Sequence, residues 1–312
     1  MRTLRFHENG APEDVLRLED TESPLPGPGQ VRIAVQACGL NPADWALCGG
    51  LFAGDLPRGV GLEVSGTVDA LGEGVAGLTI GDPVFGPAPF TGPTAGASEQ
   101  AVLDTWFPRP AALAPADAAA LPMAVETAYR GLDALNVRDG VTLLINGAGT
   151  TVGYAAVQIA LQRGAKVIAT AGETYADALR AMGAQVTSYG DGMDDRVRAA
   201  MGGPVGLAFD VAPRSNALPL LVRTVARPEH VLTLTDVVSA KELGVRTGGP
   251  DDVGSENDTG PRTHVLGEYG QLAAEGRFTI PVARTYPLDD WRAAVARSQS
   301  GRAGGKLVLT IG

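Results

Sequence analysis

The amino-terminal part of the sequence is built from short runs in which apolar and polar residues alternate. Residues 31–37 (VRIAVQA) and 63–70 (EVSGTVDA) show this period of two, which predicts strands with one buried face. Stretches rich in glycine and proline at residues 24–30 and 86–96 separate such runs and predict turns. Residues 1–118 are therefore predicted to form a β-rich barrel or sandwich.

From about residue 119 the pattern changes to short, continuously apolar runs with amphipathic stretches between them. Continuous apolar strands that alternate with helices are typical of a parallel sheet covered on both faces. Residues 119–262 are therefore predicted to form a doubly wound α/β domain, with loop signals over residues 236–262. The tail, residues 263–312, returns to a helix, an extended piece, a helix and a strand. The predicted parallel strands lie at residues 141–146, 166–170, 185–189, 206–211 and 230–235.

Length, charge and cysteine content narrow the class of protein. A chain of 312 residues exceeds the usual size of one domain, so two are expected. The formal net charge of −10 argues against a nucleic-acid partner or an anionic membrane surface. No signal peptide and no apolar stretch of transmembrane length is found, and Cys38 and Cys48 are best interpreted as reduced thiols. We therefore expect a cytoplasmic protein that acts on a small molecule.

One glycine turn carries the chemistry of the α/β domain. It follows a buried strand and opens a helix, so that backbone N–H groups and the positive end of the helix dipole face an anion. A G-x-G-x-x-G fingerprint would place its third glycine at Val152, and Gly153 comes one residue late. The complete strand–turn–helix–strand setting favours pyrophosphate binding over a turn without a ligand. The predicted cofactor-binding residues of the turn are Gly147, Ala148, Gly149, Thr150, Thr151, Val152 and Gly153.

Each residue type in this turn has a physical purpose. Gly149 permits close approach of the backbone to the phosphates, and Gly153 lets the helix pack tightly on the strand. The hydroxyl groups of Thr150 and Thr151 can donate to the pyrophosphate oxygens.

Four segments in the same order resemble the zinc-independent quinone oxidoreductases of the medium-chain dehydrogenase/reductase superfamily. They are residues 35–50 (VQACGLNPADWALCGG), 61–86, 121–170 and 278–312, whereas residues 236–262 match poorly. The resemblance implies a GroES-like catalytic domain made of residues 1–118 and completed by residues 263–312, with a Rossmann domain at 119–262. It also implies homodimers that transfer a hydride from NADPH to quinones, enones or enoyl thioesters, in a site between the two domains.

The resemblance explains the late glycine. The turn of this family usually reads A-x-x-G-x-x-G, which Gly147 or Ala148 opens and Gly153 closes. Thr150 stands where the family has its middle glycine, which is a departure from the pattern.

The resemblance also bears on metal binding. Zinc-dependent relatives carry a cysteine and a histidine at the positions where this sequence has Asn41 and Leu62. Asparagine is a poor zinc ligand and leucine is none, so no metal is expected. Cys38 is interpreted as a small core residue, and Glu63 as structural.

Without a metal, hydrogen-bond donors have to stabilise the charge that develops on the substrate oxygen. The resemblance assigns this role to Asn41; the alternative is a turn-capping asparagine before Pro42. Asp44 is expected to orient the loop rather than donate a proton, unless burial raises its pKa. Residues 1–118 contain no tyrosine, so we expect the proton to come from solvent and assign no general acid.

The predicted substrate pocket has an apolar wall of Trp45, Phe52 and Phe90. Each of these side chains can equally belong to the core, and for Phe52 this is the favoured alternative. Thr127 matches a position that commonly contacts the nicotinamide end of the cofactor.

The end of the second parallel strand predicts NADPH rather than NADH. A carboxylate usually stands there in proteins that prefer NAD, but here the strand runs into Ala171 and Gly172, with Glu173 slightly later. Contacts near the adenosine and its 2′-phosphate are expected from Gly172, Tyr189, Arg302 and Lys306. Arg302 is the better phosphate partner because its planar fork can bond two oxygens, although it can also be a solvated loop residue.

The sequence thus predicts an NADPH-dependent, zinc-free oxidoreductase that reduces a quinone or an α,β-unsaturated carbonyl compound. One alternative is an enoyl reductase of polyketide or other specialised metabolism. A second alternative is a protein that binds NADPH without turnover.

Overall fold

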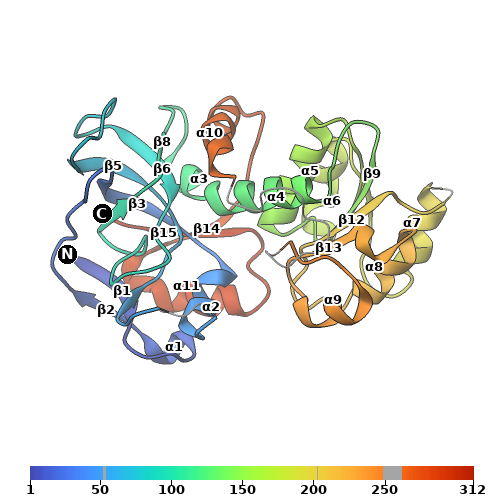
Figure 1. Ribbon diagram of the computed structural model, residues 1–312, viewed down its shortest axis with the longest axis horizontal. Helices are drawn as coiled ribbons and strands as arrows, with labels where there is room; N and C mark the ends of the chain where they lie inside the picture. Colours follow the sequence, from blue (N-terminus) through green and yellow to red (C-terminus); the bar gives the residue numbers. More distant parts are fainter. Residues whose placement is uncertain (52–53, 202, 249–261) are drawn as a thin grey trace. The chain divides into compact units, whose positions relative to one another are not determined.

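The computed structural model describes residues 1–51, 54–201, 203–248 and 262–312. The chain forms two compact units, one of Met1–Met123 with Thr263–Gly312 and the other of Ala124–Arg262 (Figure 1). The first boundary lies five residues beyond the one predicted, at 118/119, because the short helix α3 (Pro115–Ala119) packs on the sheet of the first unit.

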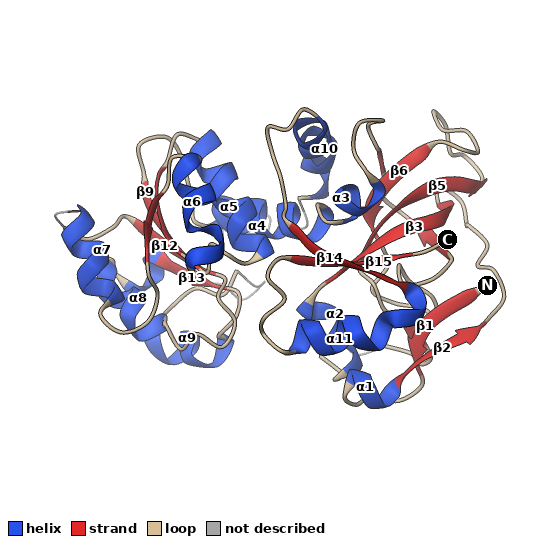
Figure 2. Cartoon of the chain, turned by 180° about the vertical axis from the view of Figure 1, so that it is seen from behind, coloured by secondary structure: helices blue, strands red, loops and turns tan. Residues whose placement is uncertain are grey.

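The first unit is built on a seven-stranded sheet in the order β14-β15-β3-β5-β6-β8, with β7 paired to β3 (Figure 2). The tail strand β15 pairs antiparallel with β3, so that Leu309 lies opposite Cys38. A smaller sheet has the order β2-β1-β4. The strands are β1 (Arg2–Phe6), β2 (Leu16–Asp20), β3 (Val31–Leu40), β4 (Arg58–Gly59), β5 (Glu63–Leu71), β6 (Pro83–Pro87), β7 (Gln100–Leu103), β8 (Phe107–Pro108), β14 (Val282–Pro287) and β15 (Lys306–Thr310).

The burial pattern along β3 changes halfway. Residues 31–36 alternate between buried and half-buried, as the period of two predicts. The pairing register with β5 then shifts between Val35 and Ala37, and every residue from Ala37 to Leu40 is buried. Ala37 packs with Ala119 of α3, whereas Cys38 belongs to the main core. This doubly covered end of β3 leads directly into Asn41.

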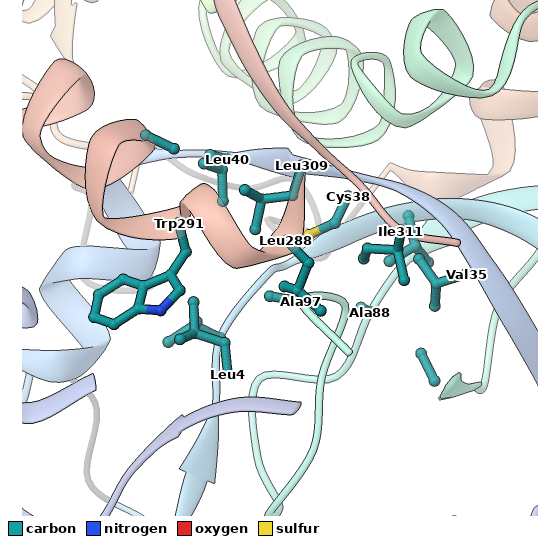
Figure 3. Packing of buried hydrophobic residues seen from close by; sticks show 14 of the residues in the cluster. Leu4, Val35, Cys38, Leu40, Ala88, Ala97, Leu288, Trp291, Leu309 and Ile311 are labelled. Carbon is teal, nitrogen blue, oxygen red and sulfur yellow. The ribbon is translucent and has the colours of Figure 1, made fainter. Parts of the chain in front are cut away.

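The main core of the first unit joins both ends of the chain. Leu4, Cys38 and Leu40 from the first residues pack with Trp291 and Leu309 from the last (Figure 3). Trp291 is 2% exposed and begins α11. Besides α3, the helices of this unit are α1 (Pro12–Val15), α2 (Pro42–Cys48), α10 (Leu266–Ala274) and α11 (Trp291–Gln299), with single 3-10 turns at Thr263–Val265 and Leu288–Asp290.

The second unit contains a five-stranded sheet in the order β11-β10-β9-β12-β13, in which all pairs are parallel. Helices α7, α8 and α9 bury apolar side chains against one face, and α5 and α6 lie along the other (Figure 2). The elements are α4 (Pro122–Ala134), which begins at the boundary, β9 (Thr142–Asn146), α5 (Thr151–Gln162), β10 (Lys166–Thr170), α6 (Glu173–Ala181), β11 (Gln185–Thr187), α7 (Met193–Met201), β12 (Leu207–Asp210), α8 (Leu218–Thr224), β13 (Val231–Thr233) and α9 (Val237–Leu243), with a 3-10 turn at Pro228–His230.

This topology confirms the predicted fold class, with a Rossmann-type parallel sheet in one unit and a β-rich, GroES-like sheet in the other. The strand order reverses between β9 and β12, since the chain builds outward from β9 to β11 and then returns to β12. In open parallel sheets, ligands bind outside the carboxyl ends of the strands at such a switch point. None of the described helices is both long and apolar enough to span a lipid bilayer.

The segment with predicted loop signals, residues 236–262, begins with a helix rather than a loop. Residues Val237–Leu243 form α9, whose first turn is capped by the Asp236 carboxylate accepting from Ser239 N at 3.0 Å. Gly244 ends the helix in the left-handed conformation, with φ 69°. An aspartate before the helix and a glycine after it are the sequence signals that we overlooked.

Candidate functional site

The glycine turn follows β9 and requires glycine at two positions. Gly147 has φ 86°, and a Cβ there would lie 2.8 Å from Ala212 N. A Cβ on Gly153 would lie 2.2 Å from Gly147 O. At Gly149 a Cβ would meet only Tyr175 Cδ2, at 3.5 Å, so this side of the turn is open. Gly147 and Gly153 therefore shape the cradle, and Gly149 leaves space above it.

Thr150 has a defined purpose as the N-cap of α5. Its hydroxyl oxygen accepts from Gly153 N at 3.0 Å, and its backbone is extended, which suits any residue. A glycine at this position would leave that N–H group without a side-chain partner. The Thr150 hydroxyl oxygen thus occupies the Gly153 N–H group, which can then no longer face an anion. The hydroxyl group keeps its own proton, which it can donate to an anion instead. Thr151 and Val152, both half-buried, form the first turn of the helix.

A chain of polar side chains lies beneath the turn, at the carboxyl ends of four strands. Asn146 Nδ2 donates to Asp210 Oδ1 at 2.8 Å, and Thr170 Oγ1 donates to Asn146 Oδ1 at 2.7 Å. Thr233 Oγ1 donates to Asp210 Oδ2 at 2.7 Å. The turn joins this network, since Gly147 N donates to Thr170 Oγ1 at 3.1 Å. The network fixes the turn to the ends of its neighbouring strands.

We did not predict this network from the sequence. Each of the four residues ends an apolar run, and all are at most 1% exposed. A polar residue at the end of every buried strand is a signal that the sequence contains, because parallel strands end at the same edge of the sheet.

Two residues predicted to lie near the adenosine of the cofactor, Gly172 and Tyr189, are close together in the second unit. Tyr189, which is 65% exposed, lies beside Gly172: a Cβ on that glycine would be 3.8 Å from the tyrosine hydroxyl. The Arg196 guanidinium donates to the backbone oxygens of Asp191 at 2.9 Å and Ser188 at 3.0 Å. Arg196, which the sequence analysis missed, therefore holds the loop that carries Tyr189.

In the first unit, Asn41 lies in a buried polar cluster. Its Nδ2 donates to Glu63 Oε1 at 2.9 Å, and its Oδ1 accepts from Lys306 Nζ at 2.6 Å. Lys306 and Glu63 also form an ion pair, and the second Glu63 oxygen accepts from Met123 N at 2.8 Å. Gly39 makes room for this arrangement, since a Cβ there would lie 2.5 Å from Glu63 Oε1.

The cluster corrects the prediction for Lys306. We expected its ammonium group near the 2′-phosphate of the cofactor, but the side chain is 1% exposed and its partners are Glu63 and Asn41. A lysine that pairs with a buried carboxylate would leave that charge uncompensated if it turned to a phosphate.

Asp44 connects the two loops of the cluster. Its carboxylate accepts from Asn41 N and from Gly61 N, each at 2.7 Å. Burial is the largest influence on this group and raises its pKa to about 7. The same burial raises the pKa of the Cys38 thiol well above its ordinary value, with the nearby Asp44 and Glu63 charges adding to the effect. Asp44 thus holds the loop in place and titrates near neutral pH.

The three predicted pocket aromatics have different surroundings. Trp45 belongs to the main core, which is the alternative that the sequence left open, and its Nε1 donates to Ser298 Oγ at 2.8 Å. Phe90 is 43% exposed, and its backbone oxygen accepts from Arg58. Phe52 lies outside the described residues.

The remaining predicted contacts lie on separate elements. Thr127 is half-buried on α4, and its hydroxyl donates to Glu126 Oε2 at 3.4 Å. Arg302 is exposed in the turn between α11 and β15, where its backbone N–H donates to Ser300 Oγ at 3.2 Å.

The residues around Asn41 do not suit zinc. Leu62 is an aliphatic side chain with 0% exposure, and Asn41 Oδ1 is already bonded to a cation, Lys306. A second cation at this oxygen would be repelled by the ammonium group. Among the residues that the structure describes, no group of three or more histidine, cysteine, aspartate or glutamate side chains is arranged to hold a metal ion.

The family comparisons agree with this architecture. Residues 27–104 match the alcohol dehydrogenase GroES-like domain, and residues 128–309 match the zinc-binding dehydrogenase family. The quinone oxidoreductase from Coxiella burnetii superposes with a TM-score of 0.83 at 26% identity, covering 100% of this chain and 99% of that one.

Two curated relatives show the range of proteins that contain similar chains. The spectinabilin polyketide synthase system protein NorB of Streptomyces orinoci is 33% identical over 317 residues, which cover 97% of this chain and 14% of NorB. The quinone oxidoreductase of Lama guanicoe is 39% identical over 178 residues, which cover 55% of this chain and 53% of that protein. The matches thus span about half, or much less, of these relatives' own length.

The parallel sheet, the glycine turn and the two family matches point to one family of proteins. The chain belongs to the zinc-binding dehydrogenase family and is a quinone oxidoreductase-like member of the medium-chain dehydrogenase/reductase superfamily. The resemblance recognised in the sequence is therefore confirmed.

Gly153→Val is expected to abolish cofactor binding. The new Cβ would lie 2.2 Å from Gly147 O, which pushes α5 away from the turn and displaces the N–H groups that face the pyrophosphate. Overpacking of this kind costs about 1–3 kcal/mol in an ordinary core. The measurement is a cofactor titration by fluorescence together with thermal unfolding, with Gly149→Ala as the folding control because its Cβ meets only ordinary contacts. A folded Gly153→Val protein with wild-type NADPH affinity contradicts our interpretation of the turn.

Asp44 is expected to make folding stability depend on pH. Because its folded pKa is raised from 3.8 to about 7, the folded state holds this proton over a range in which the unfolded state has lost it. The stabilisation is complete below pH 3.8 and is lost as the pH rises through 7. Relative to Asp44→Asn, the wild-type free energy of unfolding should fall by on the order of 1 kcal/mol per pH unit in this window. Denaturant unfolding of both proteins at several pH values measures the difference, and parallel pH profiles would refute it.

Proposed function

We propose that this protein is an NADPH-dependent, zinc-free oxidoreductase that transfers a hydride to a quinone or an α,β-unsaturated carbonyl compound. The observation that carries the proposal is the Asn41 carboxamide, bonded to Lys306 and Glu63 at the position where zinc-dependent relatives have a metal-binding cysteine. A polarised amide donor can stabilise an oxyanion without a metal.

In this reaction the cofactor supplies the hydride. The glycine turn binds the pyrophosphate through its backbone N–H groups and the N-terminus of α5. Asn41 donates to the substrate oxygen on which negative charge develops, and Asp44 keeps the Asn41 backbone in place through the bond at 2.7 Å. With no tyrosine in residues 1–118, the proton that completes the reaction comes from solvent.

The preference for NADPH follows from the end of β10. Ala171 and Gly172 follow this strand, so no carboxylate repels a 2′-phosphate there, and Glu173 lies in the first turn of α6. In this proposal Tyr189, which lies beside Gly172, covers the adenosine. Arg302 has an exposed side chain and supplies the phosphate contact in this proposal.

Two other functions remain candidates. An enoyl reductase of polyketide or other specialised metabolism is favoured by the similarity to NorB and to mycoketide-CoA synthase of Mycobacterium tuberculosis, which is 38% identical over 210 residues. A protein that binds NADPH without turnover would be protected by the cofactor against heat but would not oxidise it. As implied by the family resemblance and the acidic charge, we propose a cytoplasmic homodimer that binds neither nucleic acid nor membranes.

A steady-state screen of NADPH oxidation distinguishes these functions. Benzoquinones and naphthoquinones are expected to be reduced fastest and simple enones second, because a quinone can accept a hydride and take its proton from water. The screen is run with and without a chelator, and activity should be unchanged. Reduction of an enoyl thioester alone favours the enoyl reductase, and no turnover with any acceptor favours the silent binder.

Arg302→Ala is expected to reduce the preference for NADPH over NADH. Charged hydrogen bonds of this type contribute about 1.5–3 kcal/mol, so the ratio of kcat/KM for the two cofactors should fall roughly tenfold or more. The measurement compares both cofactors in wild type and variant, with Arg277→Ala, an exposed arginine paired to Glu275, as the control. An equal or NADH-favouring ratio in wild type overturns the cofactor assignment. An unchanged ratio in the variant removes only Arg302 from the proposed contacts.

A further inference from the structure

One of the three lysines of the chain is buried inside the first unit. Lys166 and Lys241 are exposed, whereas Lys306 is 1% exposed and bonded to Asn41 and Glu63, which are 8% and 0% exposed. Buried charges are rare and costly, and a neutral pair of similar size often gives a protein of equal stability. The stability of the fold is therefore a weak reason for an ammonium group at this place.

The partners of Asn41 determine which way its carboxamide points. A lysine ammonium group can only donate hydrogen bonds and a carboxylate can only accept them. Oδ1 must therefore face Lys306 Nζ, at 2.6 Å, and Nδ2 must face Glu63 Oε1, at 2.9 Å. The reverse orientation would place donor against donor and acceptor against acceptor. Lys306 and Glu63 together thus fix the orientation of the Asn41 carboxamide.

One donor of the amide remains after these contacts. Nδ2 carries two hydrogens, and the described contacts of this nitrogen use one of them, on Glu63. The cation on Oδ1 draws electron density from the amide, so the second N–H becomes a stronger donor. This N–H lies on the residue to which the proposed reaction assigns oxyanion stabilisation.

We propose that Lys306 is a positioning residue of the reaction: it fixes and polarises the Asn41 carboxamide so that the second Nδ2–H is offered to the substrate oxygen. This inference rests on the proposed function, in which Asn41 is that donor. Glu63 completes the arrangement by holding the other N–H and by balancing the buried ammonium charge.

The first test is a double-mutant cycle on kcat. The neutral-pair variant, Glu63→Gln with Lys306→Met, removes both charges together so that neither is left buried alone. We expect it to bind NADPH with unchanged Kd and to lose kcat about tenfold, as a misaligned oxyanion donor does. In an Asn41→Ala background the same two changes should lower kcat less than about twofold, because the residue through which they act is absent. Lys166→Met, an exposed lysine, is the control.

The outcomes of this cycle separate positioning from general support of the fold. An unchanged kcat in the neutral-pair variant overturns the inference, and so does an equal loss in both backgrounds. A merely structural residue would lower the thermal midpoint and cofactor affinity without this dependence on Asn41.

A second measurement needs no turnover and uses a variant only to assign one signal. The sequence has six asparagines, so selective ¹⁵N labelling gives six side-chain amide pairs, and Asn41→Ser identifies one of them by its loss. In wild type we expect the two Asn41 amide protons to differ widely in chemical shift, with one protected from exchange. An ordinary, exchange-averaged pair overturns the inference. A protected pair in a protein that reduces no acceptor instead refutes the proposed reaction alone.

Discussion

The ion pair between Lys306 and Glu63 is the interaction on which the candidate site of the first unit depends. It joins the first residue of β15 to the first residue of β5, and both contact the Asn41 amide at the end of β3. Three strands of one sheet thus meet in a single buried charge cluster. Asp44 adds a carboxylate whose titration lies near neutral pH, so the local charge of this region changes under ordinary conditions.

In the second unit the strand ends at the candidate site are joined by hydrogen bonds rather than by an ion pair. Its candidate site needs a rigid edge, and the edge consists of neutral donors around a single buried carboxylate, Asp210. Hydrogen bonds from Asn146, Thr233 and the backbone N–H of Ala212 reach this carboxylate. The glycine turn is bonded to the same chain of side chains, which ties its backbone to the ends of the strands.

The pattern of apolar and polar residues was sufficient to predict the fold class and the parallel strands. Burial of a strand on one or both faces requires apolar residues at positions that are close together in the sequence. The resemblance accounts for the late glycine as part of a longer turn, but only the structure shows that Thr150 is a helix cap. Lys306 lies 265 residues from its partner Asn41 along the chain, and no local pattern in the sequence reports such a pair. The core position of Trp45 could not be chosen in advance, because an aromatic residue looks the same in sequence whether it lines a pocket or fills a core.

The pairing of β15 with β3 has a consequence for the order in which the molecule is assembled. On a ribosome, β3 emerges long before its partner, and the whole of the second unit is synthesised between them. The parallel sheet can therefore close early, while the edge of β3 that will receive β15 stays unpaired. Closing a loop of this length costs entropy that grows only slowly with its length, so the delay is a matter of timing more than of free energy. An unpaired strand edge is a template for wrong association, and during synthesis this nascent chain carries one until its last strand arrives.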